Sequence, residues 1–453
     1  MKIVIEGAGA IGAHLAKLLS REANEISVID ADSDRLARLS ENADVVTIHG
    51  NASSIKVLKS AGVQNADLFI SVTPFTHQDV NIVSALIAKN LGARRVIARV
   101  DDEDLLSPEN KLMFKEMGIE LMFYPEKIAA DEIVDQLRHT ASSDTMEFAH
   151  GKLQIVVFKL EEDSSLLDLT LKEFVEQTGQ EAMEQFRIIA IARGDHTIIP
   201  KLDTRFLFHD LVFIITRREG LPLLINIFGR SNFKINSVMI LGGSTTGQLT
   251  ASALSGKVED IKLIERDRDK CTYLTEKLPD NVNIVCGDGR NTDFLAEEGI
   301  RGYDAFVALS GSDETNVLTC VVAKKLGVGR AIAEVENLEY IHLAEEMGVD
   351  VVINKKLLTA GRIFKFTLSG RARFVKYMNG TEAEVLEYTV APKSLITQRS
   401  LSELDFPKNA IVGGVIRGSE GFIAKGDTQL EAYDRVAVFA LPDVVAQVDK
   451  FFK

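Results

Sequence analysis

The stretch that decides the fold is KIVIEGAGAIG (residues 2–12), an apolar run that leads directly into a glycine-rich turn. A buried strand, a G-x-G-x-x-G turn and the start of a helix form the opening of a dinucleotide-binding βαβ unit. The next apolar run, EISVID (25–30), ends on the acidic residue Asp30, about 20 residues downstream. The combination is far more specific than the glycines alone, and it predicts a parallel sheet with a phosphate-binding turn.

The three glycines of this turn have separate tasks. Gly7 allows the tight turn, Gly9 lets the backbone approach a pyrophosphate, and Gly12 lets the helix pack close to the strand. Free N–H groups and the positive end of the helix dipole would meet the phosphate charge. Asp30 would accept hydrogen bonds from the ribose hydroxyls and repel a 2′-phosphate. The pattern therefore favours NAD over NADP, but it does not separate NAD from ATP or ADP.

The chain then repeats itself. SVMILGGSTTG (237–247) has the form of the opening stretch at an offset of 235 residues, and IKLIERDRDK (261–270) matches ISVIDADSDR (26–35) at the same offset. Further along, residues 194–215 match residues 418–439 at an offset of 224. Such fixed offsets indicate two copies of one two-part unit.

The two parts of each copy differ in character. The front parts alternate short apolar strands with helical patterns, which predicts a parallel sheet covered on both faces. The back parts contain Ile-, Val- and Phe-rich runs separated by turn residues, which predicts a small α+β domain. The fold class is therefore α/β, with two Rossmann-like parallel-sheet domains alternating with two small α+β domains. The expected bounds are 1–135, 140–225, 234–360 and 370–453.

Further candidate contacts lie at the carboxyl ends of later strands, where the ligands of open parallel sheets bind. Thr73 and Pro74 end the fourth strand, and Arg99 lies in the fifth, where its guanidinium could pair with a phosphate. A surface ion pair is the alternative for Arg99. The predicted nucleotide contacts of the first copy are Gly7, Ala8, Gly9, Ala10, Ile11, Gly12, Asp30, Asn51, Thr73, Pro74 and Arg99.

The second copy departs from this pattern. Gly242 and Gly247 occupy the first and third glycine positions, but Ser244 stands at the second, where its side chain could crowd a pyrophosphate or donate a hydrogen bond to a phosphate. Glu265 keeps the acidic ribose partner, whereas the acid Glu334 replaces Arg99. A Rossmann scaffold without a ligand is the alternative, so the copies should differ in ligand or affinity. The candidate contacts of this copy are Gly242, Gly243, Ser244, Thr245, Thr246, Glu265 and Ser310.

The composition narrows the class of partner and compartment. The 453 residues include 52 Lys and Arg against 66 Asp and Glu, a net charge of −14, which disfavours a nucleic-acid partner. No apolar run approaches the ~20 residues that a membrane-spanning helix needs. The three cysteines show no CxxC spacing, which indicates a reducing compartment, and each is expected to be buried. We therefore expect a cytoplasmic protein.

No catalytic or metal-binding residue is predicted. Tyr273 and Lys277 have the spacing of the Tyr/Lys pair of short-chain dehydrogenases, but they fall in a helix away from where a nicotinamide would lie. His77 and Asp79 could form an acid/base pair near the nucleotide, although a solvated loop explains them more simply. An NAD-dependent oxidoreductase is the alternative function. A redox-sensing DNA-binding repressor would need a basic helix-turn-helix, and the sequence shows none.

The whole pattern resembles a known family. The motifs that carry the resemblance are GAGAIG (7–12), VIDADSDR (28–35), HGNAS (49–53), LGARRVIARV (91–100), SGSDETN (310–316) and GDTQLEAYDRVAVF (426–439). Together with the order of the four domains, they resemble the TrkA family, the regulatory subunits of Trk potassium uptake systems, which are built from tandem RCK units (regulators of potassium conductance). The chain departs from the family pattern at Glu6, Ser244 and Tyr433, the last of which stands where glycine is usual.

The resemblance implies a mechanism. Nucleotides (NAD or NADH, ATP, ADP) bind the Rossmann units of such subunits, which assemble into a ring, with a tetramer as the family expectation. The ring docks on the cytosolic face of a membrane-embedded potassium-translocating partner, and the nucleotide gates that partner by favouring one ring conformation over another. The resemblance leaves open which nucleotide activates, whether the second site is occupied, what binds the small domains and which membrane protein is the partner.

Overall fold

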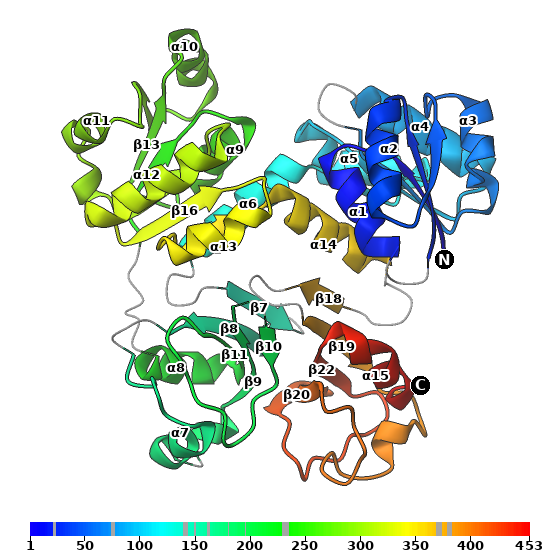
Figure 1. Ribbon diagram of the computed structural model, residues 1–453, viewed down its shortest axis with the longest axis vertical. Helices are drawn as coiled ribbons and strands as arrows, with labels where there is room; N and C mark the ends of the chain where they lie inside the picture. The colour runs from blue at the N-terminus through cyan, green and yellow to red at the C-terminus, as the bar shows by residue number, and fades with distance from the viewer. Residues whose placement is uncertain are drawn as a thin grey trace. The chain divides into compact units, whose positions relative to one another are not determined.

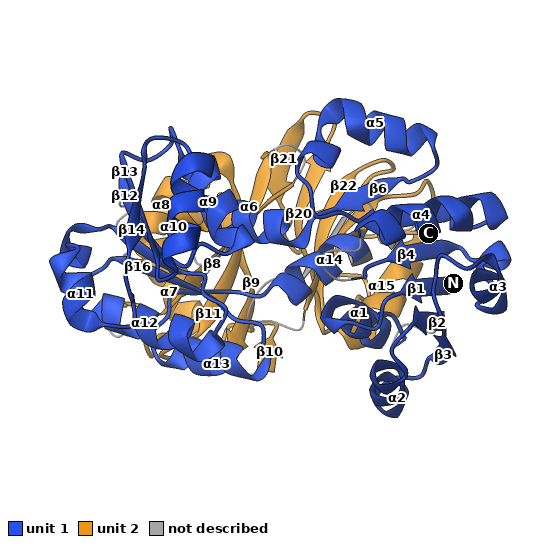
Figure 2. Cartoon of the chain, turned by 90° about the horizontal axis from the view of Figure 1, so that it is seen from above, with its two compact units in different colours: residues 1–134, 236–363 blue, residues 135–235, 364–453 orange. Residues whose placement is uncertain are grey.

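The computed structural model describes residues 1–20, 24–73, 78–138, 144–148, 151–160, 164–179, 181–194, 196–228, 235–367, 374–377 and 383–453 (Figure 1). These residues form two compact units, coloured separately in Figure 2: residues 1–134 with 236–363, and residues 135–235 with 364–453. The first unit combines the two parallel-sheet domains, and the second combines the two small domains. No helix among the described residues is long and apolar enough to span a bilayer.

The first parallel sheet has the Rossmann strand order, β3-β2-β1-β4-β5-β6. Its strands are β1 (Lys2–Glu6), β2 (Glu25–Asp30), β3 (Val46–His49), β4 (Leu68–Ser71), β5 (Arg95–Arg99) and β6 (Leu121–Phe123). Its helices are α1 (Ala10–Ser20), α2 (Ser33–Asn42), α3 (Ile55–Ser60), α4 (Gln78–Leu91), α5 (Pro108–Glu116) and α6 (Pro125–Arg138). Because β1 lies between β2 and β4, the direction of winding reverses beside β1. In open parallel sheets the ligand crevice lies at such a reversal, which here is at the carboxyl ends of β1 and β4.

The second parallel sheet repeats this order as β14-β13-β12-β15-β16-β17. Its strands are β12 (Ser237–Leu241), β13 (Asp260–Glu265), β14 (Val282–Cys286), β15 (Ala305–Ala308), β16 (Arg330–Glu334) and β17 (Val351–Ile353). Its helices are α9 (Thr245–Leu254), α10 (Arg268–Lys277), α11 (Thr292–Glu297), α12 (Asp313–Lys325), α13 (Glu339–Glu346) and α14 (Lys355–Thr367). The inner strands β1, β4, β5, β12, β15 and β16 are buried almost throughout, as their continuous apolar sequences require, whereas the edge strands β3 and β14 are largely half-buried or exposed.

The small domains are antiparallel sheets with matching strand orders, β7-β8-β11-β9-β10 and β18-β19-β22-β20-β21. The first contains β7 (Asp144–Phe148), β8 (Leu153–Lys159), β9 (Phe186–Arg193), β10 (His196–Ile198) and β11 (Leu211–Arg217), with α7 (Leu171–Thr178) and α8 (Leu221–Ile227). The second contains β18 (Phe374–Tyr377), β19 (Glu384–Thr389), β20 (Ala410–Arg417), β21 (Glu420–Ile423) and β22 (Arg435–Ala440), with α15 (Val445–Phe451). The expected α/β class, with alternating Rossmann and small domains, is confirmed.

An ion pair between a buried aspartate and a partly exposed arginine recurs in both small domains. Arg193 donates to both carboxylate oxygens of Asp210, each at 2.8 Å, and Asp210 is fully buried. At an offset of 224, Arg417 makes the same two-pronged contact with Asp434, at 3.0 and 2.8 Å. Each aspartate also accepts a backbone N–H from three residues upstream, so its charge is well satisfied. The tail motif that repeats in the sequence therefore encodes a structural ion pair.

Tyr433, which departs from the family pattern, affects only the turn before this ion pair. Its φ of 73° lies in the left-handed region, where glycine carries no steric penalty. His209 has a φ of 66° at the matching position of the first copy. Both copies therefore accommodate a side chain at a turn position that favours glycine.

The two small domains share one hydrophobic core. Phe213 of the first and Phe439 of the second pack with ring centroids 5.8 Å apart inside this core. Arg187 reaches across from β9 and donates from Nη1 to the carbonyl of Ala424 at 2.7 Å and to that of Val412 at 3.4 Å. Burial lowers the pKa of Arg187. The second unit is thus held together by apolar packing and by a buried guanidinium.

One expectation about the cysteines is wrong. Cys271 and Cys320 are buried, but Cys286 is exposed at the end of β14. Because β14 is an edge strand, no neighbouring strand covers that side of its last residue. All three thiols are free, as the absence of a CxxC spacing suggested.

Replacing Arg187 with methionine should loosen the pairing of the small domains. The change removes the donor of two buried carbonyls, which costs about 1–3 kcal/mol of unfolding free energy. Urea unfolding should show the loss, and hydrogen exchange should quicken in β9 and β20. Arg218→Met, at an exposed arginine of the same domain, is the matched control. Equal stability and exchange in the two variants would contradict this role of Arg187.

Candidate nucleotide-binding site

The glycine turn after β1 excludes side chains at two of its positions. Gly7 has a φ of 98°, and a Cβ there would lie 3.0 Å from the backbone nitrogen of Thr73. A Cβ at Gly12 would lie 1.8 Å from the carbonyl oxygen of Gly7, which is an impossible contact. The N–H of Gly7 donates to Ile29 of β2 at 2.8 Å. The turn therefore brings the start of α1 directly against the end of β1, with its first N–H groups at the crevice.

Asp30 is tied to the same turn. Its Oδ2 accepts the N–H of Ala8 at 2.6 Å, and its Oδ1 accepts the N–H of Asp32 at 2.8 Å. A carboxylate has about four acceptor positions, so these two bonds leave room for ribose hydroxyls. The acid expected to bind ribose thus also holds the glycine turn to the end of β2.

The other predicted contacts of the first copy lie around this crevice. Ala10 and Ile11 form the first turn of α1. Asn51 follows β3, and its Oδ1 accepts from the N–H and the hydroxyl of Ser53 at 2.8 and 2.5 Å, so its side chain shapes the loop before α3. Pro74 and His77 lie outside the described residues.

A buried asparagine, which our sequence analysis missed, joins the ends of β4 and β5. Asn81 of α4 accepts the N–H of Thr73 at 3.0 Å through Oδ1. Its Nδ2 donates to the carbonyls of Thr73 and Arg99, each at 3.2 Å. Asn316 makes the equivalent contacts in the second copy, with Ser310 and with the carbonyl of Glu334. The identical residue at the same offset of 235 was the available signal.

Glu6, the residue before the turn, is a buried acid. It is 1% exposed, and its Oε2 accepts hydrogen bonds from Ser71, at 2.5 Å, and from Ser84. Among the described residues, Oε1 has no hydrogen-bond partner. Burial raises the pKa of Glu6 to about 7, although the two serine hydroxyls lower it, and the nearby charge of Asp30 raises it further. Glu6 is therefore an acid that titrates near neutral pH beneath the glycine turn.

Arg99 is already paired inside the protein. It is 6% exposed, with Nε 2.9 Å from Asp101 and Nη2 3.5 Å from Glu126. Arg99 therefore forms ion pairs, as the alternative predicted, but these pairs are buried and do not lie on the surface. The start of α6 covers the end of β5. In the second copy Glu334 pairs with Lys355, the first residue of α14, at 2.7 Å. The two copies carry opposite charges at this strand end, and each charge has an opposite partner on the helix that follows the last strand of its sheet, α6 or α14.

The second glycine turn has the same backbone and different side-chain contacts. Gly242 has a φ of 103°, and a Cβ at Gly247 would lie 2.2 Å from the carbonyl oxygen of Gly242. Ser244 accepts the N–H of Gly247 at 3.2 Å and so caps α9. This bond uses one of the free N–H groups that a phosphate would otherwise meet. Thr245 and Thr246 form the first turn of α9.

Glu265 is held more tightly than Asp30. Its carboxylate accepts the N–H groups of Gly243, Arg266 and Asp267, and Lys270 forms an ion pair with it at 2.9 Å. Burial raises the pKa of Glu265, but the hydrogen bonds from Lys270 and the backbone outweigh it and lower the pKa overall.

The copies therefore differ at the ribose end of the predicted site. At the position matching Lys270, Arg35 pairs instead with Asp32 at 3.2 Å. A ribose in the second copy would have to displace Lys270 from the acid.

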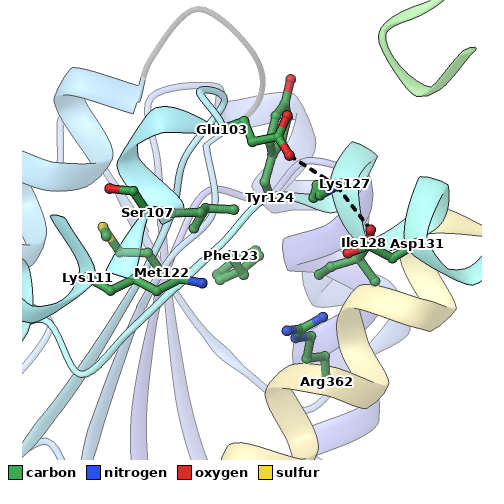
Figure 3. A pocket seen from close by; sticks show the side chains of 11 residues that line it. Glu103, Ser107, Lys111, Met122, Phe123, Tyr124, Lys127, Ile128, Asp131 and Arg362 are labelled. Carbon is green, nitrogen blue, oxygen red and sulfur yellow. Dashed lines mark ion pairs between the residues drawn. The ribbon is translucent and has the colours of Figure 1, made fainter. Parts of the chain in front are cut away.

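A cavity of about 290 Å³ in the first unit lies among α5, β6, α6 and α14 (Figure 3). Tyr124, Lys127 and Arg362 are among the residues that line it. None of its lining residues is a predicted nucleotide contact. Lys127 is paired with Glu103 at 3.0 Å and with Asp131 at 3.1 Å, as the dashed lines in Figure 3 mark. The cavity is thus separate from the glycine turn.

Comparison with protein families decides the class of the chain. Residues 3–125 and 238–355 match the TrkA-N domain, and residues 155–229 and 385–453 match the TrkA-C domain. The chain belongs to the TrkA family. The resemblance inferred from the sequence is therefore confirmed, including the alternating order of the two domain types.

Curated members of the TrkA family match along their whole length. The chain is 35% identical to the Trk system potassium uptake protein TrkA homolog of Archaeoglobus fulgidus and 31% identical to TrkA homolog 1 of Methanosarcina mazei, in each case over 100% of both chains. It is 30% identical to TrkA of Halomonas elongata, over 97% of this chain and 96% of that one.

Solved structures share the fold at lower identity. The RCK domain of GsuK is 17% identical, with a TM-score of 0.61 over 99% of this chain and 94% of that chain. The GsuK channel bound to NAD is 18% identical, with a TM-score of 0.62 over 100% of this chain and 78% of that chain. At this identity the likeness shows that the TrkA-family chain has the fold of RCK domains.

The stability of the first Rossmann domain should depend on the proton of Glu6. The pKa rises from 4.5 to about 7 on folding, so the stabilisation is complete below about pH 4.5 and is lost as the pH rises to about 7. At about 1.4 kcal/mol per pH unit, the loss amounts to roughly 3 kcal/mol. Urea unfolding of the wild type and Glu6→Gln across this range should show the loss only in the wild type.

The exposed acid Glu41 provides the control for this experiment. Glu41→Gln should follow the pH profile of the wild type, because its carboxyl is in water in both states. The same pH profile in the wild type and Glu6→Gln would contradict the assignment.

Proposed function

We propose that this chain is the cytosolic, nucleotide-sensing regulatory subunit of a Trk-type potassium transporter. Membership of the TrkA family over the full length supports this role. The observation that carries the nucleotide part is the first glycine turn, where Asp30 holds Ala8 beside the free N–H groups of α1. GsuK, which has the same fold, is described in complexes with NAD and with ADP. In this proposal the chain has four domains, with bounds 1–135, 140–225, 234–360 and 370–453.

The ligand of the first copy is NAD(H) or ATP/ADP in this proposal. The glycine turn and α1 receive the phosphates, Asp30 receives the ribose, and Thr73 lies at the opposite wall of the crevice. Arg99 is already paired with Asp101 and Glu126, so a phosphate can use its positive charge only by competing with these two carboxylates for the guanidinium. The remaining contacts proposed from the sequence are Gly9, Ala10, Ile11, Asn51 and Pro74.

The second copy binds a nucleotide more weakly or serves as scaffold. Lys270 neutralises the acid that would receive a ribose, and Ser244 caps the helix that would receive a phosphate. Glu334 places an acid where the first copy has Arg99. The two copies thus keep one fold and divide the tasks of sensing and support.

Regulation follows from differential binding. A nucleotide shifts a ring of subunits only as far as it binds one conformation more tightly than another. We propose a homo-oligomer, a tetramer by family expectation, that sits on the inner face of the membrane through its potassium-translocating partner. The protein is then cytoplasmic and peripheral, and it does not bind nucleic acid.

Catalysis is the less favoured function. Tyr273 is 50% exposed on α10, and the Nζ of Lys277 lies 5.2 Å from the centre of its ring, as expected of a surface pair. The other pair considered is His77 with Asp79 of the first copy; Asp79 lies in the first turn of α4, and His77 is outside the described residues. We therefore propose a ligand sensor in place of an NAD-dependent oxidoreductase.

Replacing Asp30 with alanine should weaken nucleotide binding about 10- to 100-fold, because hydrogen bonds to a charged group contribute about 1.5–3 kcal/mol. Isothermal calorimetry with NAD, NADH, ATP and ADP measures the change. Asp30→Asn keeps an acceptor for Ala8 and separates loss of charge from loss of the turn. Glu265→Ala, the same change in the second copy, is the control and should alter affinity far less. Unchanged affinity in Asp30→Ala would refute this site.

The regulatory role is tested with the membrane partner. The chain should co-purify with its Trk-type membrane subunit, and potassium flux through that subunit in vesicles should depend on both the chain and the nucleotide. Asp30→Ala should bind the partner and lose the nucleotide response. A flux that is indifferent to the chain and to ATP, ADP and NADH would refute the proposal.

A further inference from the structure

Glu6 has no task in the function described above, yet it lies directly beneath the proposed phosphate-binding turn. It is the last residue of β1 and precedes Gly7. Its side chain shares the sheet face of α4 and is closed off by Ser71 of β4 and Ser84 of α4. A carboxyl group that is 1% exposed, with one oxygen lacking a described partner, is costly to keep ionised.

A proton count links Glu6 to its neighbours. The hydroxyl of Ser71 lies 2.5 Å from Oε2 of Glu6 and 2.8 Å from Oδ1 of Asn81, but it has only one proton to donate. An ionised Glu6 accepts that proton. A protonated Glu6 can instead donate its own hydrogen to a serine oxygen, so that Ser71 donates to Asn81.

The acceptor to which Ser71 donates determines the hydrogen bonding of the Thr73 hydroxyl. The Oδ1 of Asn81 lies within hydrogen-bond distance of three donors, namely the N–H of Thr73, the hydroxyl of Thr73 and the hydroxyl of Ser71. An amide oxygen has two lone pairs. When Ser71 donates to Asn81, the N–H of Thr73 fills the second lone pair and the hydroxyl of Thr73 is released. When Ser71 donates to Glu6, the hydroxyl of Thr73 stays on Asn81.

We propose that Glu6 is a proton-sensitive positioning residue for the nucleotide of the first copy. Its protonated form releases the hydroxyl of Thr73 toward the ligand and removes a negative charge from beneath the phosphates. Dinucleotides and nucleoside phosphates therefore bind more tightly as the pH falls through neutrality. This inference rests on the proposed nucleotide site.

The charges around Glu6 support this direction. Asp30 of β2 acts on it as a like charge and favours the protonated form. The contacts from β4 and α4 are the uncharged hydroxyls of Ser71 and Ser84. Arg99 of β5 is joined to the network only through its carbonyl, and its own charge is paired. A bound pyrophosphate adds negative charge at the turn and raises the pKa of Glu6 further.

The second copy supplies an internal comparison. Leu241 stands at the position of Glu6 and Ala308 at that of Ser71, so both the acid and the serine that links it to the asparagine are absent there. Asn316 is retained, and its Oδ1 accepts the N–H and the hydroxyl of Ser310 at 2.9 and 2.7 Å. The asparagine therefore has the same structural role in both copies, whereas the buried acid and the serine beside it occur only in the first copy.

The test is calorimetric binding of NAD to the full chain between about pH 6 and about pH 8.5, a range in which its pyrophosphate does not titrate. The wild type should bind several-fold more tightly at the low end. Glu6→Gln, which mimics the protonated acid, should show no such dependence and keep an affinity near the wild-type value at low pH. Glu6→Leu, which restores the residue of the second copy, should also be independent of pH. Glu41→Gln should follow the wild type.

The outcomes are distinguishable. A pH profile shared by the wild type and Glu6→Gln would overturn the inference, because the pH dependence would then come from another group. NAD binding without any pH dependence would overturn the inference alone and leave the nucleotide site standing. If the wild type bound none of NAD, ATP and ADP at any pH, the proposed function and the inference would both fall. An infrared carbonyl band of a protonated carboxyl, present in the wild type at low pH and lost in Glu6→Gln, reports the proton without any ligand.

Discussion

The close approach of the first helix to the first strand is the constraint on which the rest of each Rossmann domain depends. A Cβ at Gly12 would lie 1.8 Å from the carbonyl of Gly7, and one at Gly247 would lie 2.2 Å from that of Gly242. With no side chain at either position, the helix begins directly at the end of the strand. Its unpaired N–H groups then face the crevice where the winding of the sheet reverses. Any displacement of the helix would carry those donors away from the ends of β1 and β4.

Duplication preserved this constraint while the charges around it diverged. Asp30 and Glu265 both accept the N–H of the second residue of their turn, so each acid has a structural task in addition to the ribose contact proposed for its position. Only the second acid is paired with a lysine, Lys270. The strand end that carries Arg99 in one copy carries Glu334 in the other, and each has a partner of opposite charge on the helix after the last strand of its sheet. A fold with two equivalent crevices thus presents two different electrostatic environments.

The features that the sequence predicts correctly are local or periodic. The glycine spacing, the acid at the end of the second strand and the fixed offsets of 235 and 224 residues depend on contacts between near neighbours, so they could be read directly. The features that the sequence does not predict depend on which helices and strands pack against one another. The burial of Arg99 requires that α6 begin beside β5, and the exposure of Cys286 requires that β14 be an edge strand. Asn81 was missed because a polar residue in a helix has no recognisable partner until the strand ends lie around it.

The sequence by itself determined the duplicated α/β architecture, the two glycine turns and the family, because hydrophobic periodicity and glycine positions act over a few residues. Only the tertiary structure decided how the polar groups are satisfied. In the structure Lys270 forms an ion pair with Glu265, and Phe213 and Phe439 pack in the core that the small domains share. Glu6 lies among Ser71, Ser84 and Asp30. The physical reason is that burial and charge pairing depend on distances between segments far apart in the chain, and packing alone sets those distances.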